Sequence, residues 1–228
     1  MILLLVCSVL ALLAIYLVRR QKPLSTAQRW ALAASGNLGA TWNDRFDRLK
    51  LRFSRREAQQ NLLQWWGIHS AHEAAEKLAW LANEGHSTPF RAYHRELSRL
   101  PAAKLESWLA AQPEDDREQL RWLHGNLGEF QNGDLIGWDM ERLINLARVI
   151  HTAGWIDEAT AWNHIAFAAR RLQSSYSSWH EMSDNYLAGR IWWGGDQDSN
   201  EHFRQSANRM LTEWSSPWVK LDWRTPLY

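Results

Sequence analysis

Four charged residues lie in line with the apolar residues of predicted helices, and they are the side chains best placed to do chemistry. They are Asp139, Arg142, Glu158 and Arg190. Two carboxylates that share a cleft can act as general acid and general base. Asp139 and Glu158, however, begin two consecutive helices joined by a short link, and antiparallel packing puts them at opposite ends of that pair. At such a separation they cannot act on one bond, which favours structural roles over catalysis.

Ion pairs account for these charges without a reaction. If three helices run up, down and up, Glu158 at the start of the second lies level with Arg190 near the end of the third. We therefore predict a Glu158–Arg190 ion pair on the core-facing surface, and an Asp139–Arg142 pair one turn apart on the first helix. The helix dipole also stabilises acids at helix N-termini. The sequence thus predicts structural ion pairs, and no catalytic, cofactor-binding or metal-binding residues.

Three amphipathic helices must position these residues. Apolar side chains recur at three- and four-residue spacing over residues 138–153, 158–173 and 179–193. Gly154 ends the first helix and Asp157 caps the second. Ser178 and Glu181 form a capping box for the third.

Shorter helices are predicted on both sides of this region. Ser70 and Glu73 form a capping box for a helix that ends at Gly85. Other helices are predicted over residues 26–35, 90–97, 102–111, 114–123 and 199–214. Trp218 and Trp223 are expected to fold the tail back onto the bundle. The predicted fold class is all-α, with one multi-helix domain over residues 23–228 whose core is residues 138–218.

Residues 42–57 combine arginines and apolar residues at helical spacing. The arginines are Arg45, Arg48, Arg52, Arg55 and Arg56, and Phe46, Leu49 and Phe53 recur on the flank beside them. This pattern is typical of a basic amphipathic helix, which near a membrane lies along the anionic leaflet and contacts lipid. The alternative is a solvated surface helix whose arginines are partly balanced by nearby acids.

Residues 2–18 form an uncharged apolar run, which as a helix is roughly 25 Å long and just able to span a bilayer. A cleaved signal peptide is disfavoured, because no basic region precedes the run and no small-residue cleavage site follows it. Arg19, Arg20 and Lys22 follow the run, so the positive-inside rule places the rest of the chain in the cytoplasm. We predict a transmembrane anchor with its basic flank over residues 1–22, and a single-pass protein of the bacterial inner membrane.

The composition excludes several classes of site and partner. One cysteine, Cys7, rules out intramolecular disulfides and multi-cysteine zinc sites, and His69 and His72 lack the spacing of a zinc motif. Without the three basic residues of residues 19–22, 23 of the 26 basic residues remain against 25 acidic ones, which argues against nucleic acid as a partner. The 16 tryptophans indicate either an aromatic core or an adhesive surface.

A set of aromatic, glycine and charged residues carries a resemblance to a known family. The residues are Trp138, Asp139, Arg142, Gly154, Trp155, Ile156, Glu158, Ala159, Trp162, Ser178, Trp179, Tyr186, Gly189, Arg190, Trp192, Ser216, Pro217 and Trp218. In this pattern the chain resembles the bacterial domain-of-unknown-function 1266 family over roughly residues 26–223. The resemblance implies an all-helical cytoplasmic domain in a Gram-negative bacterium, with no assigned activity.

Three functions remain open. The first is a non-enzymatic module that binds another protein through exposed aromatic surface. The second is a hydrolase or transferase with a site between helices near Asp139 and Arg142. The third is an anionic-lipid or nucleic-acid surface binder that uses the residue 45–56 arginines. The sequence does not identify the partner, the oligomeric state or any cofactor.

Overall fold

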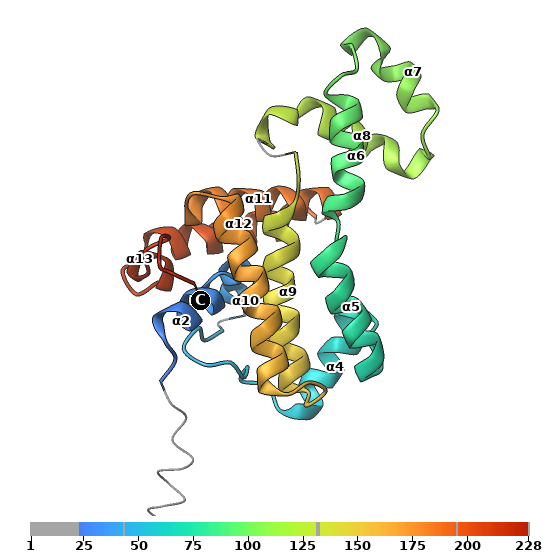
Figure 1. Cartoon of the computed structure of the whole chain (residues 1–228). Helices are drawn as coiled ribbons and strands as arrows, with labels where there is room; N and C mark the ends of the chain where they lie inside the picture. Colours follow the sequence, from blue (N-terminus) through green and yellow to red (C-terminus); the bar gives the residue numbers. More distant parts are fainter. Residues whose placement is uncertain (1–22, 43, 131–132, 195, 228) are drawn as a thin grey trace, which may run out of the picture.

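The computed structural model describes residues 23–42, 44–130, 133–194 and 196–227, and its secondary structure is all helical, with no strand among these residues (Figure 1). The α-helices are α2 (Thr26–Ala33), α3 (Gly36–Thr41), α4 (Arg55–Trp66), α5 (Ala71–Asn83), α6 (Ser87–Leu97), α7 (Leu105–Ala110), α8 (Arg117–Gly125), α9 (Ile136–Thr152), α10 (Glu158–Ser175), α11 (Trp179–Trp193), α12 (Gln197–Thr212) and α13 (Pro217–Lys220). Short 3-10 helices are η1 (Ala102–Lys104), η2 (Glu114–Asp116) and η3 (Leu127–Glu129). The all-α prediction is confirmed for this part of the chain.

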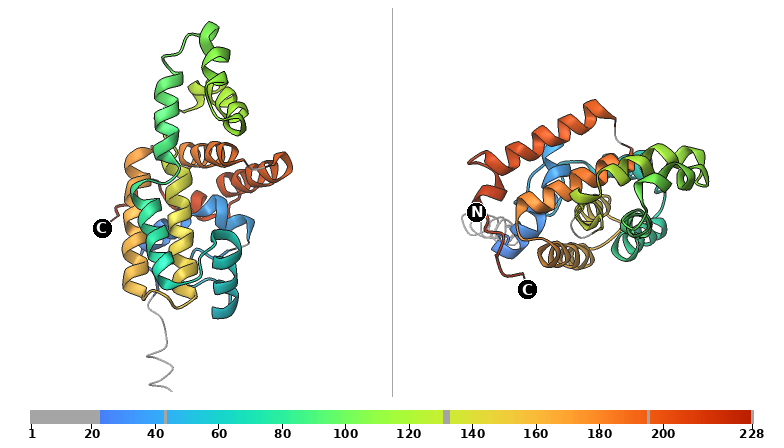
Figure 2. Two further views of the ribbon diagram at one scale, coloured as in Figure 1. Left: turned by 90° about the vertical axis from the view of Figure 1, so that its right-hand side faces the viewer. Right: turned by 90° about the horizontal axis from the view of Figure 1, so that it is seen from above.

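Helix α9 is the central element of the fold. Of its 17 residues, only Arg142 and His151 are not buried. Helix α10 runs antiparallel beside α9, and α4 and α5 also pack against it (Figures 1 and 2). Because neighbours surround α9, its charged side chains must find partners inside the protein rather than in water.

Helices α11 and α12 lie across the end of the α9–α10 pair instead of alongside it (Figures 1 and 2). Gly189 allows this close crossing, because a Cβ atom there would lie 2.3 Å from Cβ of Trp138. The predicted up-down-up arrangement is therefore wrong for the third helix. Glu158 begins α10 at the end remote from α11, and its carboxylate accepts a hydrogen bond from Trp162 Nε1 at 3.3 Å. The predicted Glu158–Arg190 ion pair consequently does not form.

A cluster of tryptophans joins the tail to α2 and α11. The Trp179 and Trp218 rings stack with centroids 5.5 Å apart, and Trp30 lies 4.6 Å from Trp179. Trp223 packs edge-on against Trp179 at 4.9 Å, and Trp218 Nε1 donates to the Ala33 carbonyl at 2.7 Å. The prediction that the tail folds back onto the bundle is confirmed, and these indoles are core residues.

Helices α6, α7 and α8 form a lobe that projects beyond the bundle (Figure 1). Its core contains Phe90, Leu109, Leu120 and Phe130, and Trp192 of α11 packs edge-on against Phe90 at 5.2 Å. The lobe is thus joined to the bundle through α11.

Residues 44–54, between α3 and α4, are irregular, so the basic helix predicted over residues 42–57 is wrong; helical structure begins only at Arg55. The cause is Arg148 of α9, which is fully buried. Its guanidinium donates to the carbonyls of Arg45, Arg48 and Leu49 at 2.6–3.2 Å, and it forms an ion pair with Asp44 at 2.7 Å. In a helix those carbonyls would accept backbone hydrogen bonds within the helix, whereas in the irregular segment they can accept hydrogen bonds from the buried guanidinium.

The five arginines of this segment therefore do not share one helical face. Arg45 and Arg48 both pair with Asp47, and Arg55 Nε donates to the Ala153 carbonyl at 2.9 Å. Arg52 and Arg56 are exposed.

The predicted transmembrane anchor lies outside the described residues. Within the part of the chain that the structure describes, no helix combines the length and apolar character needed to cross a membrane.

Candidate functional site

Most of the charged side chains that α9 buries bind the backbone of a neighbouring element. Asp139 accepts hydrogen bonds from the backbone N–H groups of His86 at 3.0 Å and Ser87 at 2.8 Å, at the start of α6. Helix α6 has no side-chain cap of its own, so Asp139 supplies one from α9. Gly85 makes room for this carboxylate, since a Cβ there would lie 2.1 Å from Asp139 Oδ2. The predicted Asp139–Arg142 ion pair is replaced by this capping arrangement.

Glu141 plays the same kind of role for α3. Its carboxylate accepts hydrogen bonds from Asn37 N at 3.2 Å and Asn37 Nδ2 at 2.5 Å, and Asn37 Oδ1 accepts one from Ser183 at 2.8 Å. Burial raises the pKa of Glu141 well above its usual value, and the Asn37 hydrogen bonds oppose that rise. Like Arg148, Glu141 uses its charged group to hold a neighbouring segment in place through hydrogen bonds.

Arg142 differs from these residues because its guanidinium forms no ion pair with a carboxylate among the described residues. Its guanidinium lies between the rings of Trp66 and Trp138, 4.6 and 4.5 Å from their centroids. Its hydrogen bond within the protein joins Nη1 to His86 Nδ1 at 3.0 Å. Burial lowers the pKa of Arg142 to about 10, partly offset by the nearby charge of Asp139, so the side chain stays protonated at neutral pH.

Arg190 of α11 presents a second such charge. Its guanidinium lies 3.8 Å from the centroid of the Phe203 ring and donates to Ser199 Oγ. Its Nε atom is buried and has no hydrogen-bond partner in the described structure. Burial lowers the pKa of Arg190, while the charge of Asp196 acts in the opposite direction. Neither Arg142 nor Arg190 forms an ion pair with a carboxylate among the described residues.

Both arginines line one cavity of about 260 Å³, which we call the arginine cavity. Its other lining residues are Leu38, Trp42, Trp65, Trp66, Trp138, Tyr186, Trp193, Ser199 and Phe203. Burial raises the pKa of Tyr186, although both guanidinium charges are near enough to oppose the rise. Three lining tryptophans are exposed, Trp42 at 41%, Trp65 at 64% and Trp193 at 54%. The cavity is therefore positively charged and aromatic, and three of the indoles that line it are accessible.

This arrangement can bind an anion. Planar guanidinium groups bind carboxylates and phosphates through paired hydrogen bonds, and ring faces on both sides of Arg142 fix its orientation. The carboxylate of Asp139 accepts two backbone hydrogen bonds and also lies 3.4 Å from His86 Nδ1. Within the described ranges, no group of three or more His, Cys, Asp or Glu side chains is arranged to hold a metal ion.

Sequence reasoning identified both arginines but not the site that they share. Trp66, Tyr186 and Phe203 come from three different helices, and their meeting depends on the angle at which α11 crosses α9. In the sequence, the adjacent pair Trp65-Trp66, at the end of a helix that is otherwise strongly polar, was the feature that could have indicated this cavity.

The comparisons with known proteins add a family. The family model described as "Protein of unknown function (DUF1266)" matches residues 61–223, a span that contains the lobe, α9, α10, α11 and all lining residues of the arginine cavity except Leu38 and Trp42. No curated protein and no solved structure matches the chain. Since the match covers well over half of the sequence, the chain belongs to the DUF1266 family of proteins of unknown function.

Proposed function

We propose that this domain is a non-enzymatic binding module that recognises a carboxylate presented by a partner protein. The observation that carries the proposal is the arginine cavity, where Arg142 and Arg190 lie on aromatic rings without a carboxylate ion pair among the described residues. Partly buried charges that lack an opposite charge destabilise a fold, because desolvation is not repaid. A ligand carboxylate would pair with these guanidinium groups and so offset the cost of their desolvation.

The size of the cavity favours part of a larger partner. At about 260 Å³ it is smaller than the pockets of roughly 300–1,000 Å³ that enclose whole small ligands. It can take an acidic side chain, or a chain-terminal carboxylate with its neighbouring apolar side chain. The exposed rings of Trp42, Trp65 and Trp193 then extend the contact outside the cavity. Tryptophan and arginine are the residues most enriched among the energetically dominant positions of protein interfaces.

The other two functions receive less support. A hydrolase or transferase near Asp139 needs a free acid or base, and the carboxylate of Asp139 already accepts two backbone hydrogen bonds. A lipid-binding or nucleic-acid-binding helix over Arg45–Arg56 needs a continuous helical face, and that segment is irregular up to Ser54.

We further propose that the module acts at the cytoplasmic face of the inner membrane. The apolar run of residues 2–18 and the basic residues directly after it support this location. Membrane fractionation followed by protease treatment of spheroplasts tests it. Extraction of the intact chain by alkaline carbonate, or digestion of the domain from the periplasmic side, would contradict the proposed location.

Peptide display against the full chain in detergent tests the proposed function. We expect selected peptides to share an acidic residue, or a free C-terminus, next to an apolar side chain. Arg142→Met and Trp65→Ala should each weaken their binding about tenfold or more, since hydrogen bonds to charged groups contribute roughly 1.5–3 kcal/mol. Arg99→Gln, an exposed change on the distant lobe, is the matched control and should have no effect. Selected peptides without an acidic group, or equal binding by Arg142→Met, would overturn the proposal.

A further inference from the structure

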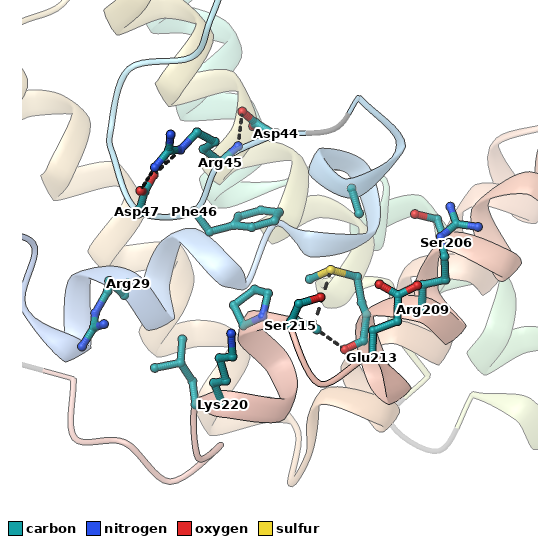
Figure 3. Close-up of a pocket in the computed structure, with 15 residues that line it drawn as sticks. Arg29, Asp44, Arg45, Phe46, Asp47, Ser206, Arg209, Glu213, Ser215 and Lys220 are labelled. Carbon is teal, nitrogen blue, oxygen red and sulfur yellow. Dashed lines mark hydrogen bonds and ion pairs between the residues drawn. The ribbon is translucent and has the colours of Figure 1, made fainter.

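A second and larger hollow lies on another part of the surface, formed by α2, the irregular segment after α3, α12 and α13 (Figure 3). Its volume is about 540 Å³. We call it the basic groove, because Arg29, Arg45, Arg209 and Lys220 are among its lining residues. In Figure 3, Arg29 lies at the left of the hollow, Lys220 at its lower edge, and Arg209 at the right, near Ser206.

The charges of the groove do not cancel within the protein. Asp44 is paired with the buried Arg148, and Asp47 is paired with Arg45. Three cations then remain, Arg29, Arg209 and Lys220, and none forms an ion pair with a carboxylate in the part of the chain that the structure describes. One further acid, Glu213, lines the groove. Three cations against one acid leave an excess of two positive charges.

A buried hydroxyl group gives an independent sign that the groove holds a ligand. Ser206 of α12 lines the groove and is 0% exposed, yet its Oγ atom has no hydrogen-bond partner among the described residues. Buried hydroxyl groups nearly always have a partner, because an unmade hydrogen bond costs free energy. An oxygen-rich ligand in the groove would supply that partner and would also neutralise the cations.

The position of the groove along the chain indicates what that ligand is. Arg29 lies on α2, the first described helix, one turn after its capping residue Ser25. Only six residues lie between Val18, the last of the apolar run, and Ser25, so even a fully extended link keeps α2 within about 25 Å of the end of that run. The headgroup layer itself extends roughly 5–8 Å beyond the hydrocarbon. If the run spans the bilayer, the link is thus short enough for the groove to meet the anionic inner leaflet.

We propose that the basic groove binds the phosphodiester headgroup of an anionic phospholipid. Arg29, Arg209 and Lys220 supply the positive charge that attracts the headgroup, and Ser206 donates a hydrogen bond to one of the phosphate oxygens. This site does not involve the arginine cavity, so it can fail or hold whatever the outcome of the carboxylate proposal, but the choice of a lipid rests on the proposed location at the inner membrane.

Native mass spectrometry of the full chain in detergent micelles tests the proposal, with dioleoyl phosphatidylglycerol and dioleoyl phosphatidylcholine as probes. We expect one phosphatidylglycerol to bind at least tenfold more tightly than phosphatidylcholine. The triple change Arg29→Gln, Arg209→Gln, Lys220→Gln should weaken phosphatidylglycerol binding about 10- to 100-fold. Ser206→Ala leaves the net charge unchanged, and it should also weaken binding.

The matched control removes the same charge from the projecting lobe, through Arg95→Gln, Arg99→Gln and Lys104→Gln, all of which are exposed. It should leave phosphatidylglycerol binding intact. An equal loss in the control would show general charge attraction and overturn the proposal. So would equal binding of both lipids. If soluble glycerol 3-phosphate competes at the affinity of the lipid, the ligand is a free phosphate compound, and the lipid assignment is wrong.

Discussion

The same substitution should affect stability very differently at two arginines of the same helix. Arg148 is bound on all sides by the segment after α3, whereas Arg142 faces the arginine cavity. Methionine keeps much of the length and apolar volume of either side chain while it removes the charge. We therefore compare Arg148→Met with Arg142→Met.

The structure sets the size of each effect. Arg148→Met leaves the Asp44 carboxylate, whose side chain is 7% exposed, without its cation, and three backbone carbonyls without a donor. Removing one member of a buried ion pair costs about 3–5 kcal/mol. Arg142→Met loses one hydrogen bond and two ring contacts but also removes a desolvated charge that lacks a carboxylate ion pair. We expect the free energy of unfolding to change by less than about 1 kcal/mol, because these effects oppose each other.

Thermal unfolding of the full chain, followed by near-ultraviolet circular dichroism in one detergent, measures both. In a chain of this size 1 kcal/mol corresponds to roughly 2–4 °C, so Arg148→Met should lower Tm by about 6–20 °C and Arg142→Met should change it by less than about 4 °C. The loss in Arg148→Met should shrink in acid, because burial already raises the pKa of Asp44 and the unpaired carboxyl can then take up a proton. If both variants lose the same stability, Arg142 is a structural residue, and the distinction made between them is wrong.

Three further predictions concern the packing around α9. Burial raises the pKa of Glu141 in the folded chain, so the folded state holds that proton more tightly and wild-type stability falls as pH rises above the ordinary value of 4.5. Denaturant titrations from pH 5 to 8 measure this effect: the stability of Glu141→Gln relative to wild type should rise by up to about 1.4 kcal/mol per pH unit. A stability difference that does not change with pH would count against a buried carboxyl that titrates. Gly189→Ala places a methyl group 2.3 Å from Cβ of Trp138 and should lower the free energy of unfolding by about 1–3 kcal/mol. In the control Gly125→Ala the added methyl group meets nothing within 4 Å, so the free energy of unfolding should change by less than about 0.5 kcal/mol. Trp223→Ala should cost about 3–5 kcal/mol by chemical denaturation, and a neutral result would show that the tail does not stabilise the bundle.

Helix positions followed from the sequence where their signals are local. Ser70, Asp157 and Ser178 each accept the hydrogen bond expected of a helix cap, at or within a residue of the predicted starts of α5, α10 and α11. Such caps depend on residues three positions apart, so one sequence suffices to find them.

Features that depend on distant residues were not predictable in this way. Residues 42–57 have the spacing of a helix, but Arg148, about a hundred positions later, binds carbonyls of residues 45–49 and keeps residues 44–54 irregular. The crossing of α11 over α9 requires Gly189 against Trp138, a contact that periodicity does not reveal.

Contacts between residues far apart in the sequence also decide which side chains surround the two arginines of the candidate site. Arg142 and Arg190 were predicted to form ion pairs with carboxylates, whereas the structure places aromatic rings beside both guanidinium groups. Helical spacing locates a charge on a buried face; it does not show whether an acid or an indole lies opposite.

Binding of a matched acid and amide tests most directly whether the arginine cavity holds a carboxylate. N-acetyl-leucine and N-acetyl-leucinamide differ in their charge and share nearly the same shape. Isothermal titration into the full chain should give one saturable site for the acid with a roughly millimolar Kd, as expected for so small a ligand. The amide should bind about tenfold more weakly or not at all, and Arg142→Met and Arg190→Met should each abolish the preference. Equal binding of acid and amide, or an acid preference that survives in both variants, would contradict the proposed function.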